Sequence, residues 1–446
     1  AHAAQHEWDL AGGARRADLL DRAADLFEKH REELFSLCIR EAGKTLPDAV
    51  LEVREAVDFL RYYASEARAK FTEATRLPGP TGELNELRLH GRGVFACISP
   101  WNFPLAIFIG PVAAALAAGN AAIAKPAEQT PLIGALAIEL MHRAGIPRDV
   151  VQIVPGDGKV GGALTQHPLI AGVAFTGSTD TARAINRSLA DRAGPIIPLI
   201  AETGGQNVMI VDSSALPEQV TRDVVASAFQ SAGQRCSALR VLFVQDDVAD
   251  SRLGMIGGAM EALGVGDPRQ LTTDVGPVID AEAKGALDAH IADLGKTGKV
   301  LARLDASGRP GHFVSPVMVE IKSLADLDRE HFGPVLHVVR WKSGALDTVL
   351  SAINATGYGL TLGLQSRIDS TRLYVERNAR VGNLYVNRNQ IGAVVESQPF
   401  GGEGLSGTGP KAGGPHYVAR FATERVTCID TTAAGGNASL MAAMEG

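Results

Sequence analysis

Apolar residues recur every three or four positions over two segments near the start of the chain. The first segment runs from Leu19 to Cys38 and the second from Val50 to Leu60. This spacing is typical of amphipathic helices, so the pattern predicts that two helices open the chain. The segment Leu77-Pro-Gly-Pro-Thr-Gly82 is rich in helix breakers, and residues 84–90 alternate as a strand would.

Short apolar segments alternate with helix-length segments from Val94 onward. A typical longer segment is 132–144, which is closed by Gly145-Ile-Pro147. This rhythm indicates βαβ units, and therefore an α/β fold in which helices cover a parallel sheet. The predicted strands are Val94–Ile98, Ala121–Ala124, Val150–Val154, Val173–Phe175, Ile196–Ile200, Val208–Val211 and Val241–Val244.

The longest apolar segment, 103–118, does not predict a membrane span. It contains Pro104, Gly110 and Pro111, whereas a span needs about 20 strongly apolar residues. We expect a buried helix there instead. Residues 2–9 are polar, so no signal peptide is indicated.

Composition narrows the class of protein. The 446 residues allow two or three domains, and 46% hydrophobic with 21% charged residues indicates a globular fold. A net charge of -7 without a Lys/Arg-rich block disfavours nucleic acid as a partner. The 4 cysteines show no CxxC spacing, which predicts neither a disulfide framework nor a metal site. A reducing, cytoplasmic location fits this usage.

Cys236 is the strongest candidate for a reactive group. It lies among polar neighbours in Gln234-Arg-Cys-Ser237, whereas Cys38 and Cys97 lie within apolar patterns typical of buried cysteines. A thiolate is a competent nucleophile, and Arg235 is placed to lower the thiol pKa. Glu202, in Glu202-Thr-Gly-Gly-Gln-Asn207, offers a carboxylate that can activate water to release an acyl group.

Asn102 is a candidate oxyanion donor. It follows a predicted strand within Ser99-Pro-Trp-Asn-Phe-Pro104. Its amide, together with the backbone N–H of Cys236, can form an oxyanion hole, in which one donor is worth roughly 3–4 kcal/mol. The segment fits a rigid turn that packs a tryptophan equally well.

Two segments at strand ends are candidates for nucleotide binding. Lys125 and Glu128 can bond ribose hydroxyls, and a carboxylate there disfavours a 2′-phosphate, which favours NAD over NADP. Ser178, after Phe175-Thr-Gly177, can hold a pyrophosphate at a helix N-terminus or simply cap the helix. No GxGxxG fingerprint follows the first strand of this region.

A further segment, Glu330-His-Phe332, can contact the nicotinamide ribose and ring, and it fits a turn with an exposed acid as well. Taken in chain order, these segments resemble the NAD(P)-dependent aldehyde dehydrogenase superfamily. Segments 77–83, 404–417 and 431–440 are similar, more narrowly, to the L-glutamate γ-semialdehyde (Δ1-pyrroline-5-carboxylate) dehydrogenase domain of bifunctional bacterial proline utilization A proteins.

The resemblance implies a domain organisation. A Rossmann-like NAD-binding domain is expected at 1–79 and 94–203, truncated at its N-terminus, and an α/β catalytic domain at 204–415. A small β oligomerisation flap with a C-terminal tail is expected at 80–93 and 416–446. The expected partners are further copies of the chain, as a homodimer or higher oligomer, and an upstream proline dehydrogenase domain in the full-length protein.

The resemblance also implies an activity: NAD-dependent oxidation of L-glutamate γ-semialdehyde to L-glutamate, the second step of proline catabolism. Cys236 would form a thiohemiacetal and then a thioester, with Asn102 and Glu202 assisting. Expected cofactor contacts are Ile98, Ser99, Pro100, Trp101, Lys125, Ala127, Glu128, Gly158, Phe175, Thr176, Gly177, Ser178, Thr203, Gly204, Glu330 and Phe332. Expected substrate contacts are Phe103, Arg235, Ser237, Ser406, Gly407 and Thr408.

Within the glycine-rich segment 400–415, the backbone N–H groups of Gly407 and Thr408 are expected to hold the substrate α-carboxylate. Three alternatives remain open at this point. The substrate can be another ω-carboxy aldehyde such as succinate semialdehyde, the protein can be a thiol hydrolase acting on esters, or the chain can be a catalytically incompetent fragment of the bifunctional enzyme.

Overall fold

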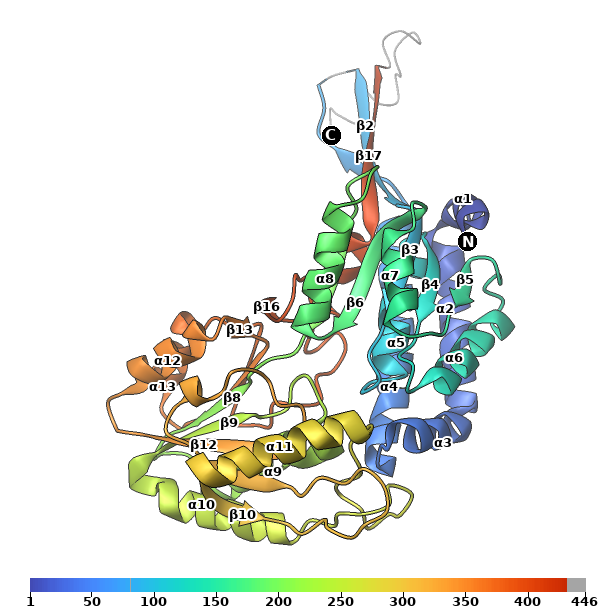
Figure 1. Cartoon of the computed structure of the whole chain (residues 1–446). Coiled ribbons are helices and arrows are strands. Elements are labelled where there is room, and N and C mark those ends of the chain that lie inside the picture. The colour runs from blue at the N-terminus through green and yellow to red at the C-terminus, as the bar shows by residue number, and fades with distance from the viewer. Residues whose placement is uncertain (81, 431–446) are drawn as a thin grey trace.

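Two large, mainly parallel sheets and two small antiparallel ones organise the chain (Figure 1). The computed structural model describes residues 1–80 and 82–430. The α/β fold expected from the alternating pattern is therefore confirmed.

Helices rather than strands build the first part of the chain. They are α1 (His2–Leu10), α2 (Gly12–Lys29), α3 (Arg31–Ala42) and α4 (Leu46–Phe71). The prediction of two opening helices was wrong in number, because the first predicted helix is broken at His30 and α1 lacks an apolar pattern. Tertiary contacts hold α1: Trp8 is buried, and its Nε1 donates to the carbonyl oxygen of Leu116 over 3.1 Å.

The first parallel sheet has five strands in the order β5-β4-β3-β6-β7. Alternate side chains of β3 point to opposite faces, so Phe95 and Cys97 join one apolar core while Val94 and Ala96 join another. The strands are β3 (Val94–Ile98), β4 (Ala121–Lys125), β5 (Val151–Ile153), β6 (Ile170–Gly177) and β7 (Leu199–Thr203), and the helices between them are α5 (Ala106–Ala117), α6 (Pro131–Arg143), α7 (Gly158–Gln166) and α8 (Thr179–Ala190).

Strand β6 is longer than predicted, since it begins at Ile170 instead of Val173, and β7 differs from the sequence prediction at both ends. β7 begins at Leu199, not at Ile196, and reaches Thr203. Pro198 has no N–H to donate to a ladder, and Ile196 is fully exposed. As a consequence, Glu202 lies on the strand itself and not in a glycine loop.

The second large sheet has seven strands in the order β10-β11-β12-β9-β8-β14-β15, and only its edge strand β10 pairs in an antiparallel sense. The strands are β8 (Val208–Val211), β9 (Val241–Gln245), β10 (Lys299–Arg303), β11 (Val317–Glu320), β12 (Val335–Trp341), β14 (Thr361–Gln365) and β15 (Asn383–Val386). The helices are α9 (Pro217–Phe229), α10 (Asp246–Glu261), α11 (Ala281–Thr297), α12 (Leu346–Ala355) and α13 (Asp369–Asn378), with 3₁₀ turns η1 (Gln230–Gly233) and η2 (Leu324–Asp326).

A three-stranded antiparallel sheet stands out from the rest of the molecule (Figure 1). It contains β1 (Thr75–Leu77), β2 (Glu83–Gly91) and β17 (Ala422–Asp430), and α14 (Tyr417–Arg420) leads into it. A short pair, β13 (Tyr358–Gly359) and β16 (Glu403–Gly404), forms the remaining sheet. The segment 431–440, which supported the resemblance, lies outside the described residues.

The predicted buried helix is confirmed as α5, whose residues are almost all buried. Glu52 of α4 holds its start, because one carboxylate oxygen accepts from the N–H groups of Leu105 and Ala106 at 3.3 and 2.9 Å. The other oxygen lies 3.0 Å from the ammonium of Lys44, also buried. None of the helices within residues 1–80 and 82–430 has the length and apolar content needed to cross a membrane.

Glu52→Ala should therefore destabilise the protein. The change leaves the Lys44 charge and two helix N–H groups buried without their acceptor, which typically costs about 3–5 kcal/mol. Chemical denaturation should show this loss in the free energy of unfolding. Glu139→Ala, which removes an exposed pair with Arg148, should change it by less than about 1 kcal/mol. Equal effects of the two substitutions would contradict the assignment.

Candidate active site

Cys236 lies on a strained loop between η1 and β9. Ser231 and Ala232 adopt φ angles of 55° and 53°, and Gly233 follows at 67°. The left-handed region costs a residue with a Cβ about 1–2 kcal/mol, and such strain is concentrated at functional sites. At Gly233 a Cβ would lie 2.2 Å from the carbonyl oxygen of Gly333, so the loop approaches the neighbouring chain more closely than another residue would allow.

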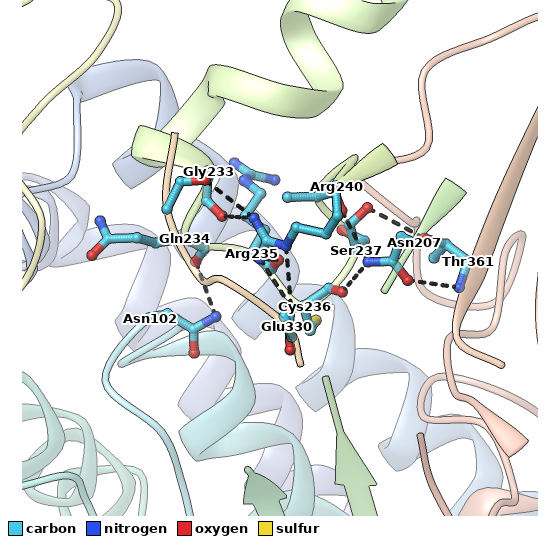
Figure 2. A network of polar contacts seen from close by, with 12 residues as sticks. Asn102, Asn207, Gly233, Gln234, Arg235, Cys236, Ser237, Arg240, Glu330 and Thr361 are labelled. Carbon is cyan, nitrogen blue, oxygen red and sulfur yellow. Dashed lines mark hydrogen bonds and ion pairs between the residues drawn. The ribbon is translucent and has the colours of Figure 1, made fainter. Parts of the chain in front are cut away.

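Two buried side chains tether this loop (Figure 2). Asn207 donates to the carbonyl oxygens of Cys236 and Ala238 at 2.6 and 3.0 Å. Arg240 donates to the carbonyl oxygens of Gly233 and Arg235 at 2.6 and 3.0 Å. The backbone on both sides of the nucleophile is therefore held by hydrogen bonds from the protein interior.

Cys236 lies where two cavities meet. The outer cavity has a volume of about 400 Å³, and the inner one about 60 Å³. Cys236 lines both, and Glu202 and Glu55 line the inner one. The outer cavity brings together many of the predicted site residues: Pro100, Trp101, Asn102, Thr176, Gly177, Ser178, Thr203, Gly204, Glu330 and Phe332.

Asn102 is buried at the wall of the outer cavity. Figure 2 shows its amide directed at the nucleophile loop, where Nδ2 donates to the carbonyl oxygen of Gln234 at 3.1 Å. An amide NH₂ group carries two donors. One therefore anchors the side chain, and the second remains for a developing oxyanion beside Cys236.

Glu202 points into the inner cavity from the end of β7. Its Oε1 accepts a hydrogen bond from the backbone N–H of Gly402 at 2.8 Å. Burial raises the pKa of Glu202 to about 8, although the Gly402 N–H and the charge of Lys411 oppose the rise. A carboxyl group with a pKa near neutrality is suited to general-base catalysis.

The Cys236 thiol has a raised pKa, not the lowered one expected from the sequence. Burial is the main cause and raises its pKa to about 12. The carboxylates of Glu202, Glu330 and Glu55 act in the same direction. Arg235 gives no compensation, because its guanidinium is buried and paired with Asp48 at 2.8 Å.

Glu330 and Phe332 form one wall of the outer cavity. Arg240 donates to Glu330 Oε1 from Nε and Nη2, at 3.2 and 3.0 Å. The Phe332 ring meets Trp101 edge-on, with centroids 5.7 Å apart. A Cβ at Gly204 would lie 1.8 Å from Glu330 Oε2, so any larger residue there would displace the Glu330 carboxylate.

The other predicted cofactor residues do not line the outer cavity, although Phe175 lines the inner one: Ile98, Ser99, Lys125, Ala127, Glu128, Gly158 and Phe175. Lys125 is buried, and its Nζ donates to the carbonyl oxygen of Pro126 at 3.1 Å. Ser178 caps α8, since its Oγ accepts from the Thr181 N–H at 3.2 Å. Ser178 therefore caps α8, as one of the two sequence interpretations expected. It also lines the outer cavity.

Several predicted substrate residues lie away from both cavities. Phe103, Arg235, Ser237 and Ser406 are buried and line neither cavity. The expectation that the Thr408 N–H holds a carboxylate was wrong, because it donates to the carbonyl oxygen of Ala201 at 2.9 Å. Segment 406–408 pairs with the edge strand β7, and the Ser406 N–H donates to the Glu403 carbonyl oxygen, which leaves the N–H of Gly407 as the remaining backbone donor of this segment.

Sequence reasoning missed Asn207, Arg240 and Glu55. Asn207 closes the Glu202 motif, and its amide type was a usable signal. Glu55 carried none, because it lies on α4 with no motif around it. Burial raises its pKa to about 8, and the charge of Glu52 adds to the rise.

The fold and the site together define an α/β protein with two large sheets, in which the candidate nucleophile Cys236 lies between a large cavity and a buried carboxylate. The chain belongs to the aldehyde dehydrogenase family, whose profile matches residues 1–427. It is 53% identical over 429 residues to bifunctional protein PutA of Escherichia coli K12, covering 94% of this chain and 32% of that protein. The chain thus spans about a third of the bifunctional relatives it matches.

Other relatives are covered more fully. The 1-pyrroline-5-carboxylate dehydrogenase of Geobacillus sp. WCH70 is 36% identical over 421 residues, which is 92% of this chain and 80% of that protein. Among solved structures, a Bradyrhizobium japonicum PutA mutant has a TM-score of 0.96 at 57% identity, covering 97% of this chain and 45% of that one. A Thermus 1-pyrroline-5-carboxylate dehydrogenase with bound NAD has a TM-score of 0.92 at 35% identity, covering 96% and 84%.

The electrostatics of the thiol can be tested by alkylation. Glu202→Gln removes one negative charge that raises the Cys236 pKa. At pH 9, where Glu202 is largely ionised, iodoacetamide should therefore alkylate Cys236 about threefold faster or more in the variant. Mass spectrometry of the Cys236 peptide separates this signal from the exposed Cys428. Glu73→Gln removes an exposed carboxylate and serves as the control, which should react at the wild-type rate. A slower reaction of Glu202→Gln than of wild type would contradict the effect of the Glu202 charge on the thiol pKa.

Proposed function

We propose that the chain oxidises L-glutamate γ-semialdehyde to L-glutamate with NAD, as a 1-pyrroline-5-carboxylate dehydrogenase. The observation that carries the proposal is the position of Cys236, which faces a large outer cavity on one side and the buried carboxylates of Glu202 and Glu55 on the other. The relatives named for this activity, one of them with bound NAD, support it.

The residues of the outer cavity fit a nicotinamide dinucleotide. Ser178 lies at the N-terminus of α8, where backbone N–H groups favour phosphate. Glu330 presents a carboxylate for ribose hydroxyls against Gly204, and Phe332 offers an apolar face. When bound, NAD supplies the hydride acceptor, and the chain supplies position and charge.

Cys236 and Asn102 act first. The Cys236 sulfur loses its proton to solvent in the outer cavity and bonds to the aldehyde carbon. The carbonyl oxygen becomes an oxyanion, which the free N–H of the Asn102 amide and the Cys236 backbone N–H stabilise. Oxidation of this thiohemiacetal leaves a thioester on Cys236.

Glu202 acts second. Its carboxylate removes a proton from water, and the hydroxide oxygen bonds to the thioester carbon. The carbon–sulfur bond breaks, glutamate leaves and the thiol is restored. A pKa of about 8 suits Glu202 both to take this proton from water and to return it to the leaving sulfur.

Glu55 is our candidate for recognising the substrate amine. It lines the inner cavity beyond Cys236, and its buried carboxyl group needs a cationic partner to ionise at neutral pH. The α-ammonium group of the semialdehyde is such a partner. The N–H of Gly407, a residue that packs against the Glu202 side chain, is the remaining donor of the expected carboxylate loop.

The other expectations stay proposals. We assign the five-stranded part (residues 1–79 and 94–203) to NAD binding, the seven-stranded part (204–415) to catalysis and the projecting sheet to homo-oligomer formation, which the exposed β17 supports. Unpaired cysteines support a reducing, cytoplasmic location. The matches to bifunctional proteins support an upstream proline dehydrogenase domain as partner.

The primary test mixes the purified chain with NAD and L-glutamate γ-semialdehyde and follows NADH absorbance. We expect NADH from the wild-type chain and none above background from Cys236→Ala, because the sulfur is the bond-forming atom. NAD calorimetry on both proteins is the control, and the two affinities should agree. NADH formation by Cys236→Ala would remove this residue as the nucleophile.

Glu55→Gln tests the substrate assignment. The variant loses a charged partner for the α-ammonium, and such a bond is worth about 1.5–3 kcal/mol. The KM for L-glutamate γ-semialdehyde should rise about tenfold or more, while that for succinate semialdehyde, which lacks the amine, should stay near its wild-type value. Glu73→Gln, an exposed match, should change neither. An equal rise in KM for both aldehydes would show that Glu55 does not recognise the substrate amine.

A further inference from the structure

The ammonium group of Lys411 is fully occupied by hydrogen bonds close to Glu202. Its Nζ donates to the carbonyl oxygens of Gly382 and Gly401, both at 2.6 Å, and to Asn383 Oδ1 at 3.2 Å. An ammonium has three donors, so each of them has an acceptor. Lys411 is half-buried, and the bonds replace the water that its charge has lost.

One peptide group joins Lys411 to Glu202. The carbonyl of Gly401 accepts from Lys411, and the N–H of the same peptide, on Gly402, donates to Glu202 Oε1 at 2.8 Å. Hydrogen bonds in such a chain polarise one another. The ammonium thereby strengthens the donor that the carboxylate receives, and it fixes the direction of that donor.

Close packing prevents this peptide from turning away. A Cβ at Gly401 would lie 3.1 Å from Glu202 Oε2 and 3.2 Å from the Lys411 Cα. Phe400 and Ala412 exchange two backbone hydrogen bonds of 2.9 and 2.8 Å beside it. The segment that carries Lys411 and the segment that carries Gly402 are thus paired in register.

We propose that Lys411 is a positioning residue, which acts through the Gly401–Gly402 peptide to hold the Glu202 carboxylate where it activates the water that releases the acyl product. The proposal rests on the function proposed above, and it concerns the second half-reaction, in which water releases the acyl group from Cys236. Lys411 touches neither the thiol nor the cavities beside it.

The charges around Glu202 give the direction of the effect. Burial raises the Glu202 pKa, and the Gly402 N–H and the Lys411 charge lower it. The other titratable groups facing Glu202 are Cys236 and Tyr417, whose pKa values it raises, with Glu55 in the same cavity. Glu403 also faces Lys411. Loss of the ammonium therefore raises the Glu202 pKa and leaves less carboxylate at neutral pH.

The test compares wild type with Lys411→Met in pre-steady-state and steady-state assays from pH 6 to 10. The first turnover of NADH should survive in the variant, because it precedes water attack. Steady-state turnover at pH 7 should fall about tenfold, and the rising limb of the pH–rate profile should move to higher pH by about one unit. Lys411→Arg keeps the charge and should keep the wild-type limb. Lys342→Met removes an exposed lysine and should change nothing.

A second readout separates this proposal from the proposed function. Infrared difference spectra, with Glu202→Gln to assign the band, report the Glu202 pKa without any substrate. An unchanged Glu202 pKa in Lys411→Met overturns the proposal, as does a turnover loss that is equal at every pH. A raised pKa supports it even if wild type forms no NADH from the semialdehyde, in which case the proposed function fails alone. Lys411→Gln, which keeps an amide donor, replaces Lys411→Met if circular dichroism shows that the latter is unfolded.

Discussion

The buried guanidinium of Arg240 is the interaction on which the site depends. It binds the carbonyl oxygens of Gly233, at the end of the strained turn, and of Arg235, next to Cys236, and it pairs with Glu330 in the wall of the outer cavity. A guanidinium can do this because its donors form a rigid fork. Without it, the left-handed run at Ser231 and Ala232 would lose the bonds that offset its cost. Arg240 therefore connects the loop that carries Cys236 to the cavity wall that contains Glu330.

Burial and the nearby carboxylate charges both raise the pKa of the Cys236 thiol. A buried sulfur flanked by carboxylates is a poor thiolate at rest, and its pKa of about 12 reflects this. The same burial moves Glu202 to a pKa of about 8, where it can accept and return protons. In the proposed mechanism, reactivity at Cys236 thus comes from the oxyanion donors that stabilise the product of its attack more than from a permanently ionised sulfur.

Local pattern predicted the elements that local forces decide. Strands such as β3 and β8 follow from short apolar runs, and α5 follows from an unbroken apolar segment. Cys236 and Glu202 stood out as catalytic candidates because each is a reactive or charged residue within a segment of small and polar residues. The site position of Glu55 and the helix α1 could not be predicted in this way. A single acid on a helix, and a helix without an apolar stripe, are identified only by their contacts with residues far away in the sequence. The same holds for Thr408, whose N–H is taken by a strand far away in sequence.

The pairing of segment 406–408 with β7 explains why the two halves of the molecule make one site. β7 is the edge of the five-stranded sheet, and an open edge offers unpaired N–H and C=O groups. The chain that returns from the seven-stranded half covers it, bridging Glu202 to Gly407. Glu202 is therefore positioned by its own strand and by the opposite half, while Cys236 comes from that half alone. Neither half holds both the nucleophile and the carboxylate, so the chemistry exists only where the two pack.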